Sequence, residues 1–192
     1  PLPPLPDLTA GLLMVPGSAA SGQSVTLTYV VTNSGAAGLT NAAWSGSIYL
    51  VGDEVTSLTN FPSLLASVPV MATFSFTNTL PTGAFLARTQ TVAVPLDSLF
   101  GNTRFVVAVD TGNSVVEGNE TNNIAIATNV TVIPTLLTLQ LPASQLLEGT
   151  AMTATLIRNG STAQPLMVTV TNDDATELSF SLSITTAVAT VT

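Results

Sequence analysis

The chain has 192 residues, of which 46% are hydrophobic and only 7% are charged, and its formal net charge at pH 7 is −8. It contains no cysteine, histidine or lysine, and its only cationic side chains are Arg88, Arg104 and Arg158. These absences exclude a Ser-His-Asp triad, a cysteine nucleophile, a P-loop and the usual zinc sites. They also argue against nucleic acid as a partner, because its affinity depends on many cationic contacts to phosphate.

The composition also bears on the protein's location in the cell. No run of about 18 apolar residues occurs, so the sequence predicts no membrane span. A Thr-, Ser- and Asn-rich chain without cysteine favours an extracellular protein that does without disulfides, and a reducing compartment is the alternative. Residues 1–6, Pro-Leu-Pro-Pro-Leu-Pro, lack the features of a signal peptide. They predict an extended linker, or alternatively an arm that docks on a neighbouring subunit.

Short strand patterns follow one another along the first two thirds of the chain. A strand region at residues 7–15 ends in the turn Pro16-Gly17-Ser18, and residues 23–33 alternate with the period of a half-buried strand. Residues 44–50 and 88–95 predict further strands, and residues 64–80 hold two weaker candidates with Phe74 and Phe76 on one face. We expect Trp44, the only tryptophan, to lie in the core between two sheets, with a sugar-stacking role as the alternative.

The most informative stretch is the turn that begins at Asp110. Residues 104–110 before it form a continuous apolar run, which predicts a strand buried on both faces, and residues 124–132 after it alternate as a second strand. The turn between them is rich in Asp, Asn, Gly and Glu, whose side chains and backbone favour tight turns.

The residues of this turn resemble those of a known family. The pattern Asp-x-x-Asn-x-Val-x-Glu-x-x-Glu-x-Asn-Asn between two strands is similar to CARDB, a cell-adhesion-related domain of bacterial surface and secreted proteins. The opening Pro-Asp-Leu-Thr, then Gly-Gln-x-Val-Thr-Leu-x-Tyr-x-Val-x-Asn-x-Gly, and a Trp followed by a Tyr-Leu strand resemble the same family. The resemblance covers residues 7–133 and implies an immunoglobulin-like sandwich of about seven or eight short strands.

Residues 134–192 predict a second β module. Strands are expected at residues 136–141, 151–158, 166–171, 178–184 and 187–192. The motifs Leu-Glu-Gly-Thr from Leu147 and Pro-Leu-x-Val-x-Val-Thr-Asn-Asp-Asp from Pro165 resemble the Calx-beta family, without its last strands. The whole chain is therefore expected to be all-β, with two tandem immunoglobulin-like antiparallel β-sandwiches, the second incomplete.

An incomplete sandwich leaves an open strand edge that another chain segment can cover. The Leu- and Val-rich segment behind the proline leader is one candidate donor, and its apolar residues are Leu8, Leu12, Leu13 and Val15. The alternative is that the second module is a domain-boundary fragment with no donor.

The clustered ionisable groups of the sequence are carboxylates. Asp110, Asn113, Glu117 and Glu120 could bind calcium, which prefers carboxylate and amide oxygens, or could instead satisfy the backbone of the turn. Glu148, Asp173, Asp174 and Glu177 form a second acidic set. The resemblance to Calx-beta implies calcium as a candidate here too, because acidic loops at one end of the sandwich bind the metal in the calcium-sensing members, although the C-terminal part that would contribute is missing. Nothing in the sequence places two carboxylates across a cleft as in a glycosidase.

These observations favour a non-catalytic protein of the bacterial cell surface or extracellular space. The leading hypothesis is a structural subunit or repeat of a filament, stalk or adhesin, whose partner is a second copy or a neighbouring module. It rests on the low charge and a mean hydropathy of +0.53, which favour association. The alternative is a calcium- or carbohydrate-binding spacer of a larger protein. No cofactor is required, and calcium is the one candidate.

Overall fold

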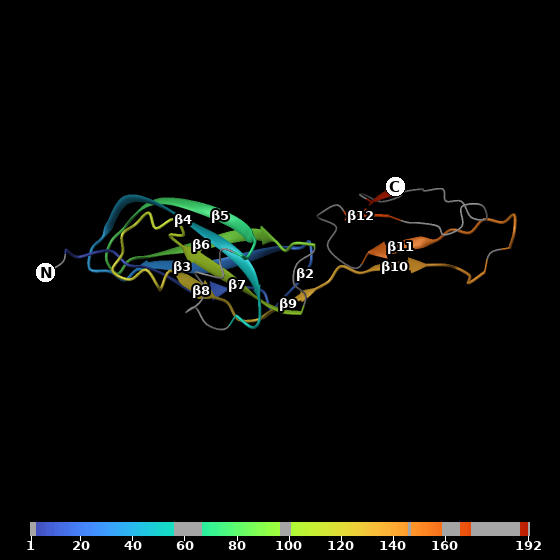
Figure 1. Cartoon of the computed structure of the whole chain (residues 1–192), viewed down its shortest axis with the longest axis horizontal. Coiled ribbons are helices and arrows are strands. Elements are labelled where there is room, and N and C mark those ends of the chain that lie inside the picture. The colour runs from blue at the N-terminus through green and yellow to red at the C-terminus, as the bar shows by residue number, and fades with distance from the viewer. Residues whose placement is uncertain are drawn as a thin grey trace.

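The computed structural model describes residues 3–55, 67–96, 101–145, 147–158, 166–169 and 189–191. All regular elements in these ranges are strands, which confirms the all-β prediction. The described part is elongated, with the N-terminus at one end and strands β10–β13 beyond β9 toward the other end (Figure 1). No helix in the described ranges is long and apolar enough to cross a membrane.

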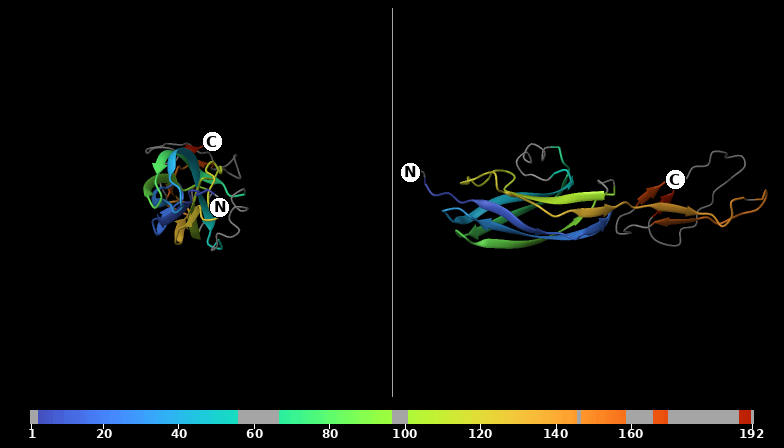
Figure 2. Two further views of the ribbon diagram at one scale, coloured as in Figure 1. Left: turned by 90° about the vertical axis from the view of Figure 1, so that its left-hand side faces the viewer. Right: turned by 90° about the horizontal axis from the view of Figure 1, so that it is seen from below.

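A three-stranded antiparallel sheet forms one layer of the sandwich. It consists of β1 (Leu8–Met14), β3 (Ser24–Asn33) and β6 (Phe85–Ala93), with β3 in the centre. Alternate residues of β3 are buried, as its period-two pattern predicts, and they are Val25, Leu27, Tyr29, Val31 and Asn33. The views in Figure 2 show the strands running lengthwise along the elongated sandwich.

The second sheet packs over the first. Its order is β2 (Ser18–Ala20), β9 (Val130–Ile133), β7 (Gly101–Val109), β4 (Leu39–Gly52) and β5 (Val70–Leu80), and β8 (Ile124–Ile126) also pairs with β7. All neighbours are antiparallel except β2 and β9, which run parallel. The sequence pattern did not predict this parallel pair, because β2 is only three residues long.

The single strand expected at residues 124–132 is divided into β8 and β9. Ile126 pairs with Val106, and Val130 pairs with Thr103. The three residues 127–129 between β8 and β9 therefore lie opposite only the two residues 104 and 105 of β7. Such an extra residue is a β-bulge, and it interrupts the ladder while keeping Val130 and Val132 buried.

Strand β7 is buried on both faces, as predicted. Phe105, Val107 and Val109 belong to the main core between the sheets. Val106 and Ala108 point to the outer face, where they form a smaller cluster with Tyr49 and Val51 of β4. Partly buried side chains packed on this outer cluster are Val55, Val68, Ile124 and Ile126. A strand covered on both sides needs no polar alternation, which explains its continuous apolar run.

Trp44 lies in the core, as expected, and is 3% exposed. Its ring stacks on Phe76, the residue opposite it on β5, with ring centres 4.1 Å apart. Arg88 of β6 lies with its guanidinium carbon 4.5 Å from the Phe76 ring centre and donates to Asn78 Oδ1 at 3.4 Å. These contacts join the two sheets along one side, and burial of Trp44 removes it as a sugar-stacking platform.

The predicted boundary at residues 133–135 is held firmly against the sandwich. Thr135 N donates to Ser21 Oγ at 2.8 Å, Thr135 Oγ1 donates to Ser21 O, and Ser21 N donates to Ile133 O. Ser21 is fully buried, so its polar groups need these partners.

Beyond the boundary the structure describes two small sheets. β10 (Leu137–Gln140) pairs antiparallel with β11 (Thr155–Arg158), and β12 (Leu166–Val168) pairs parallel with β13 (Ala189–Val191). They correspond to four of the five predicted strands, and the fifth, at residues 178–184, lies outside the described residues. A second tandem sandwich therefore stays a prediction.

Candidate functional site: the turn between β7 and β8

The turn begins with two residues in the left-handed backbone region. Asp110 has φ +45° and Asn113 has φ +47°, a conformation that Asp and Asn tolerate better than most residues. Between them Asn113 N donates to Asp110 O at 2.9 Å. The local sequence therefore favours this sharp change of direction directly after β7.

The carboxylate of Asp110 stabilises the turn from inside. Oδ1 accepts from Ser114 N and Oδ2 accepts from Val115 N, both at 2.9 Å. Asp110 is only 2% exposed, so its carboxylate loses contact with water on folding. The two hydrogen bonds offset this cost of desolvation. This arrangement is the backbone-satisfying role that sequence analysis considered for the acidic residues.

Glu117 connects the turn to the first strand of the chain. Its Oε2 accepts from Leu8 N at the start of β1, and its Oε1 accepts from Asn123 Nδ2 at 2.8 Å. Burial raises the pKa of Glu117 to about 7, although the two hydrogen bonds oppose this shift and the carboxylates of Glu120 and Asp110 add to it. Glu117 thus stands close to the midpoint of its titration at neutral pH.

Further contacts fasten the N-terminal segment to the same turn. Gly118 N donates to Pro6 O at 2.8 Å, and Asn122 Nδ2 donates to Asp7 Oδ1 at 2.9 Å. On the other side, Asp7 N donates to Asn33 Oδ1 at the end of β3. Residues 5–8 are therefore held between the turn and β3 and behave as part of the domain.

The outer residues of the turn hold one another. Glu120 Oε1 accepts from Glu117 N at 2.9 Å, and Asn119 Oδ1 accepts from both the backbone N–H and the hydroxyl of Thr121. Asn123 is 7% exposed, and its Oδ1 has no hydrogen-bond partner among the described residues.

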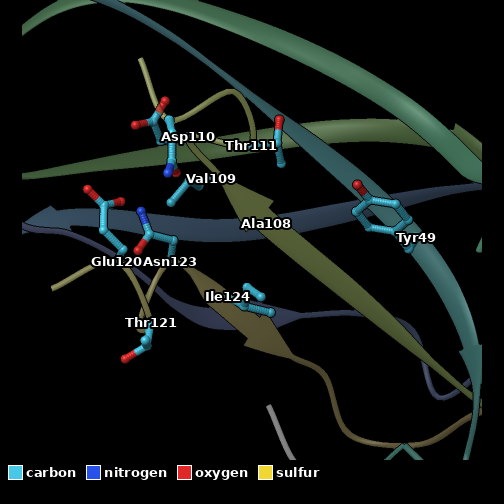
Figure 3. A pocket seen from close by; sticks show the side chains of 10 residues that line it. Tyr49, Ala108, Val109, Asp110, Thr111, Glu120, Thr121, Asn123 and Ile124 are labelled. Carbon is cyan, nitrogen blue, oxygen red and sulfur yellow. The ribbon is translucent and has the colours of Figure 1, made fainter. Parts of the chain in front are cut away.

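An open hollow of about 360 Å³ lies beside the turn, on the outer face of β4, β7 and β8. Asp110, Glu120 and Asn123 lie together on one side of it and Tyr49 lies on the other (Figure 3). Asn113, Thr111, Thr121 and the apolar ends of β7 and β8 complete its lining.

The four predicted calcium ligands occupy one turn but have different surroundings. Asp110 and Glu117 are buried and use both carboxylate oxygens as acceptors, whereas Asn113 and Glu120 are exposed. Within the described residues, no three acidic side chains are grouped to hold a metal ion. Calcium binding stays a prediction, and an ion held by Asp110 or Glu117 would have to share oxygens that already accept hydrogen bonds from N–H groups.

The other predicted site residues have different positions. Glu148 is exposed, and Asp173, Asp174 and Glu177 lie outside the described residues. The proposed donor residues Leu8, Leu12, Leu13 and Val15 lie in or directly after β1, which pairs with β3 of the same chain. Leu8 is fully buried in the domain's own core. A free donor arm is therefore not what the structure shows, and donation would require β1 to leave its own sandwich.

Sequence reasoning missed the contacts between residues 5–8 and the turn. Leu8 and Glu117 are separated by 109 positions, and no local spacing signals such a pair. The one available hint was Asp7 beside the opening of the first strand, but it did not identify a partner.

Solved structures of other proteins are similar to this chain over about two thirds of its length. The CARDB domain of a Pyrococcus furiosus protein in complex with di-metal ions is 22% identical over 68% of this chain and 96% of that chain, with TM-score 0.48. A domain of a Methanosarcina acetivorans protein, provisionally described as a cell surface protein, is 24% identical over 67% of this chain and 93% of its own, with TM-score 0.41.

A β-glucosidase from Listeria innocua in complex with glucose is 12% identical over 66% of this chain but only 16% of its own, with TM-score 0.40. Curated proteins give no match. The CARDB family model matches residues 5–127, which is well over half of the chain. The chain therefore belongs to the CARDB family, the cell-adhesion-related domains of cell surface proteins.

Proposed function

We propose that the chain is a structural subunit or repeat of a bacterial extracellular filament, stalk or adhesin. This proposal rests on where the chain enters the sandwich and where it leaves it. The chain enters near the turn at one end and leaves through β9 toward β10 at the other (Figure 1). Modules joined in this way extend along one axis, as a stalk or fibre requires.

The chemistry of the turn supports a structural role. Its two buried carboxylates accept hydrogen bonds from backbone and amide groups of the domain, so they serve its internal connections. We propose further that the chain is not an enzyme, because it lacks the histidine, cysteine and lysine that most catalytic sites use.

Assembly is proposed to occur through strand edges or contacts between modules. On β10 and β11, Leu139 lies opposite Leu156, and these side chains are 54% and 38% exposed. Leu137 shares their face and is 41% exposed. A two-stranded ribbon with an apolar face is stable only when that face is covered, and a neighbouring copy or module could cover it.

The test measures association of the full chain over a range of concentrations by light scattering and negative-stain microscopy. We expect oligomers or filaments that grow with concentration and are weakened in Leu139→Glu. Gln140→Glu is the matched control, because it adds the same charge to the next residue of β10, on the opposite face. A monomer at every concentration would contradict self-assembly and leave a spacer within a longer surface protein.

The alternative function is a calcium- or carbohydrate-binding spacer. The hollow beside Asp110, Asn113 and Glu120 favours the calcium form of this alternative. Calorimetric titration of the full chain with CaCl₂ tests it, with Glu120→Gln as the variant that should weaken binding. The carbohydrate form has less support, because Trp44 is buried in the core.

A further inference from the structure

Three Asn-x-Ser/Thr sequences occur in the chain, and such a sequence is the acceptor for N-linked sugars in exported proteins. Their asparagines are Asn119, Asn129 and Asn159, of which Asn159 lies outside the described residues. A pattern of three residues is a weak signal by itself. The structure separates the two described sites, because it shows which of them an enzyme can reach in the folded domain.

The first site lies on the outside of the turn between β7 and β8. Asn119, Glu120 and Thr121 are all exposed, and none of them belongs to a strand. Asn119 Oδ1 accepts from Thr121 Oγ1 at 2.7 Å and from Thr121 N at 3.1 Å. The turn therefore presents the asparagine and the threonine close together, and these are the two side chains that define the acceptor.

Asn119 can carry a sugar without losing a contact. Both of its hydrogen bonds use Oδ1, and within the described residues its Nδ2, the atom that a sugar would substitute, donates none. The neighbouring Asn122 and Asn123 differ, because Nδ2 of each donates to a carboxylate oxygen of the domain. Substitution at Asn119 Nδ2 thus leaves the hydrogen bonds of the turn intact.

The second site is part of a sheet. Asn129 is exposed, but Val130 is fully buried, and Thr131 pairs with residues of both β2 and β9's other neighbour, β7. Thr131 N donates to Gly17 O at 3.0 Å. An enzyme would have to pull β9 out of the sheet to bind all three residues. Of these two sites, the folded domain therefore offers only Asn119.

We propose that Asn119 is an N-glycosylation site, modified by an oligosaccharide transferase outside the cytoplasm. Asn119 Nδ2 attacks the anomeric carbon of a sugar that is joined to a lipid through a diphosphate. The bond from this carbon to the diphosphate oxygen breaks, and the lipid diphosphate leaves with the bonding electrons. The amide nitrogen loses one proton to a basic group of the transferase, and the product is an N-glycosidic bond.

An oligosaccharide at this place supplies hydration that the chain lacks. Only 7% of the residues are charged and the mean hydropathy is +0.53, whereas a glycan is bulky and solubilising. At Asn119 it stands beside the entry of residues 5–8, at the end of the sandwich away from β10 and β11 (Figure 1). It thus shields the entry without covering the surface proposed for assembly.

Mass spectrometry of the full chain isolated from the cells that make it tests this site. We expect an added oligosaccharide mass that fragmentation assigns to Asn119. Asn119→Gln should lose this mass completely, because the acceptor sequence requires asparagine. Asn129→Gln is the matched control and should keep it. An unmodified Asn119, or an added mass that is undiminished in Asn119→Gln or is lost from Asn129→Gln instead, would overturn the proposal.

Variants of Thr121 separate the acceptor sequence from the local structure of the turn. Thr121→Ser keeps the hydroxyl and should keep the modification. Thr121→Val keeps the shape of threonine without the hydroxyl and should abolish the modification with Asn119 still present. Thermal melts check that each variant folds, and full modification of Asn119 in Thr121→Val would overturn the proposal. None of these results depends on filament assembly, so the two proposals can fail separately.

Discussion

Asp110 shows how one side chain can determine a turn. It tolerates the left-handed backbone, and its two oxygens satisfy the N–H groups of Ser114 and Val115. Sequence analysis identified this stabilising role as one of two alternatives, because Asp and Asn after a strand favour such turns. It could not decide between stabilisation and calcium, since that choice depends on where the carboxylate oxygens point.

Replacing Asp110 with alanine should destabilise the domain. Asp110→Ala leaves the buried Val115 N–H without an acceptor and places alanine in the left-handed region, for a loss of about 2–4 kcal/mol in unfolding free energy. Urea unfolding followed by tryptophan fluorescence measures this loss. Asn119→Ala, an exposed change in the same turn, should shift stability by less than about 0.5 kcal/mol. Equal effects of the two variants would contradict the role given to Asp110.

Glu117 makes stability depend on pH. Its pKa rises to about 7 in the folded domain, mainly through burial, from an ordinary value near 4.5. Between these two values the folded state binds more protons than the unfolded state, so this group's contribution to stability decreases as pH rises from about 4.5 to about 7. Urea midpoints measured across this range should therefore fall for the unmodified protein.

In Glu117→Gln this pH dependence should flatten. The glutamine carbonyl can still accept from Leu8 N, and its amide can donate to Asn123 Oδ1 if the Asn123 side chain turns over. Glu120→Gln removes a neighbouring exposed carboxylate that adds only a smaller part of the shift, and it should keep most of the slope because burial is the main cause. An unchanged slope in Glu117→Gln would mean that another group titrates.

At the scale of elements, the strands were predicted well where a single pattern governs them. The buried run of β7 and the alternation of β3 and β6 follow from residue type and period. Residue type and period did not predict the bulge between β8 and β9 or the parallel β2–β9 pair. Both depend on the register of strands distant in sequence.

Strand β1 should be indispensable to its own domain. Deleting residues 1–15 removes the fully buried Leu8 and leaves the edge of β3 and the Glu117 carboxylate without partners. We expect a loss of at least about 4 kcal/mol or of the cooperative transition. Deleting residues 1–4 alone should have little effect, because the first hydrogen bond of the described N-terminal segment is the one that Leu5 O accepts from Ala37 N. A stable domain without β1 would favour the free donor arm instead.

At the scale of the whole molecule, every described residue of the main core lies before residue 134. We therefore predict that residues 1–135 fold without the rest of the chain. Trp44 is stacked in that core, so its fluorescence reports on this part alone. The urea midpoint of the shortened chain should lie close to that of the full chain, and a large decrease would show that the second segment supports the first.

The parallel pairing of β2 and β9 has a mechanical consequence. Tension between the two ends of the sandwich acts first on β1, which pairs with β3. Once β1 is detached, the tension pulls β2 from its first residue and β9 from its last. Because the strands run side by side in the same direction, the rungs Ser18–Thr131, Ala19–Val132 and Ala20–Ile133 are sheared together and cannot peel apart one at a time. The hydrogen bonds from Thr131 N to Gly17 O and from Ser21 N to Ile133 O lengthen this clamp at both ends. The domain is thus built to resist stretching along its long axis.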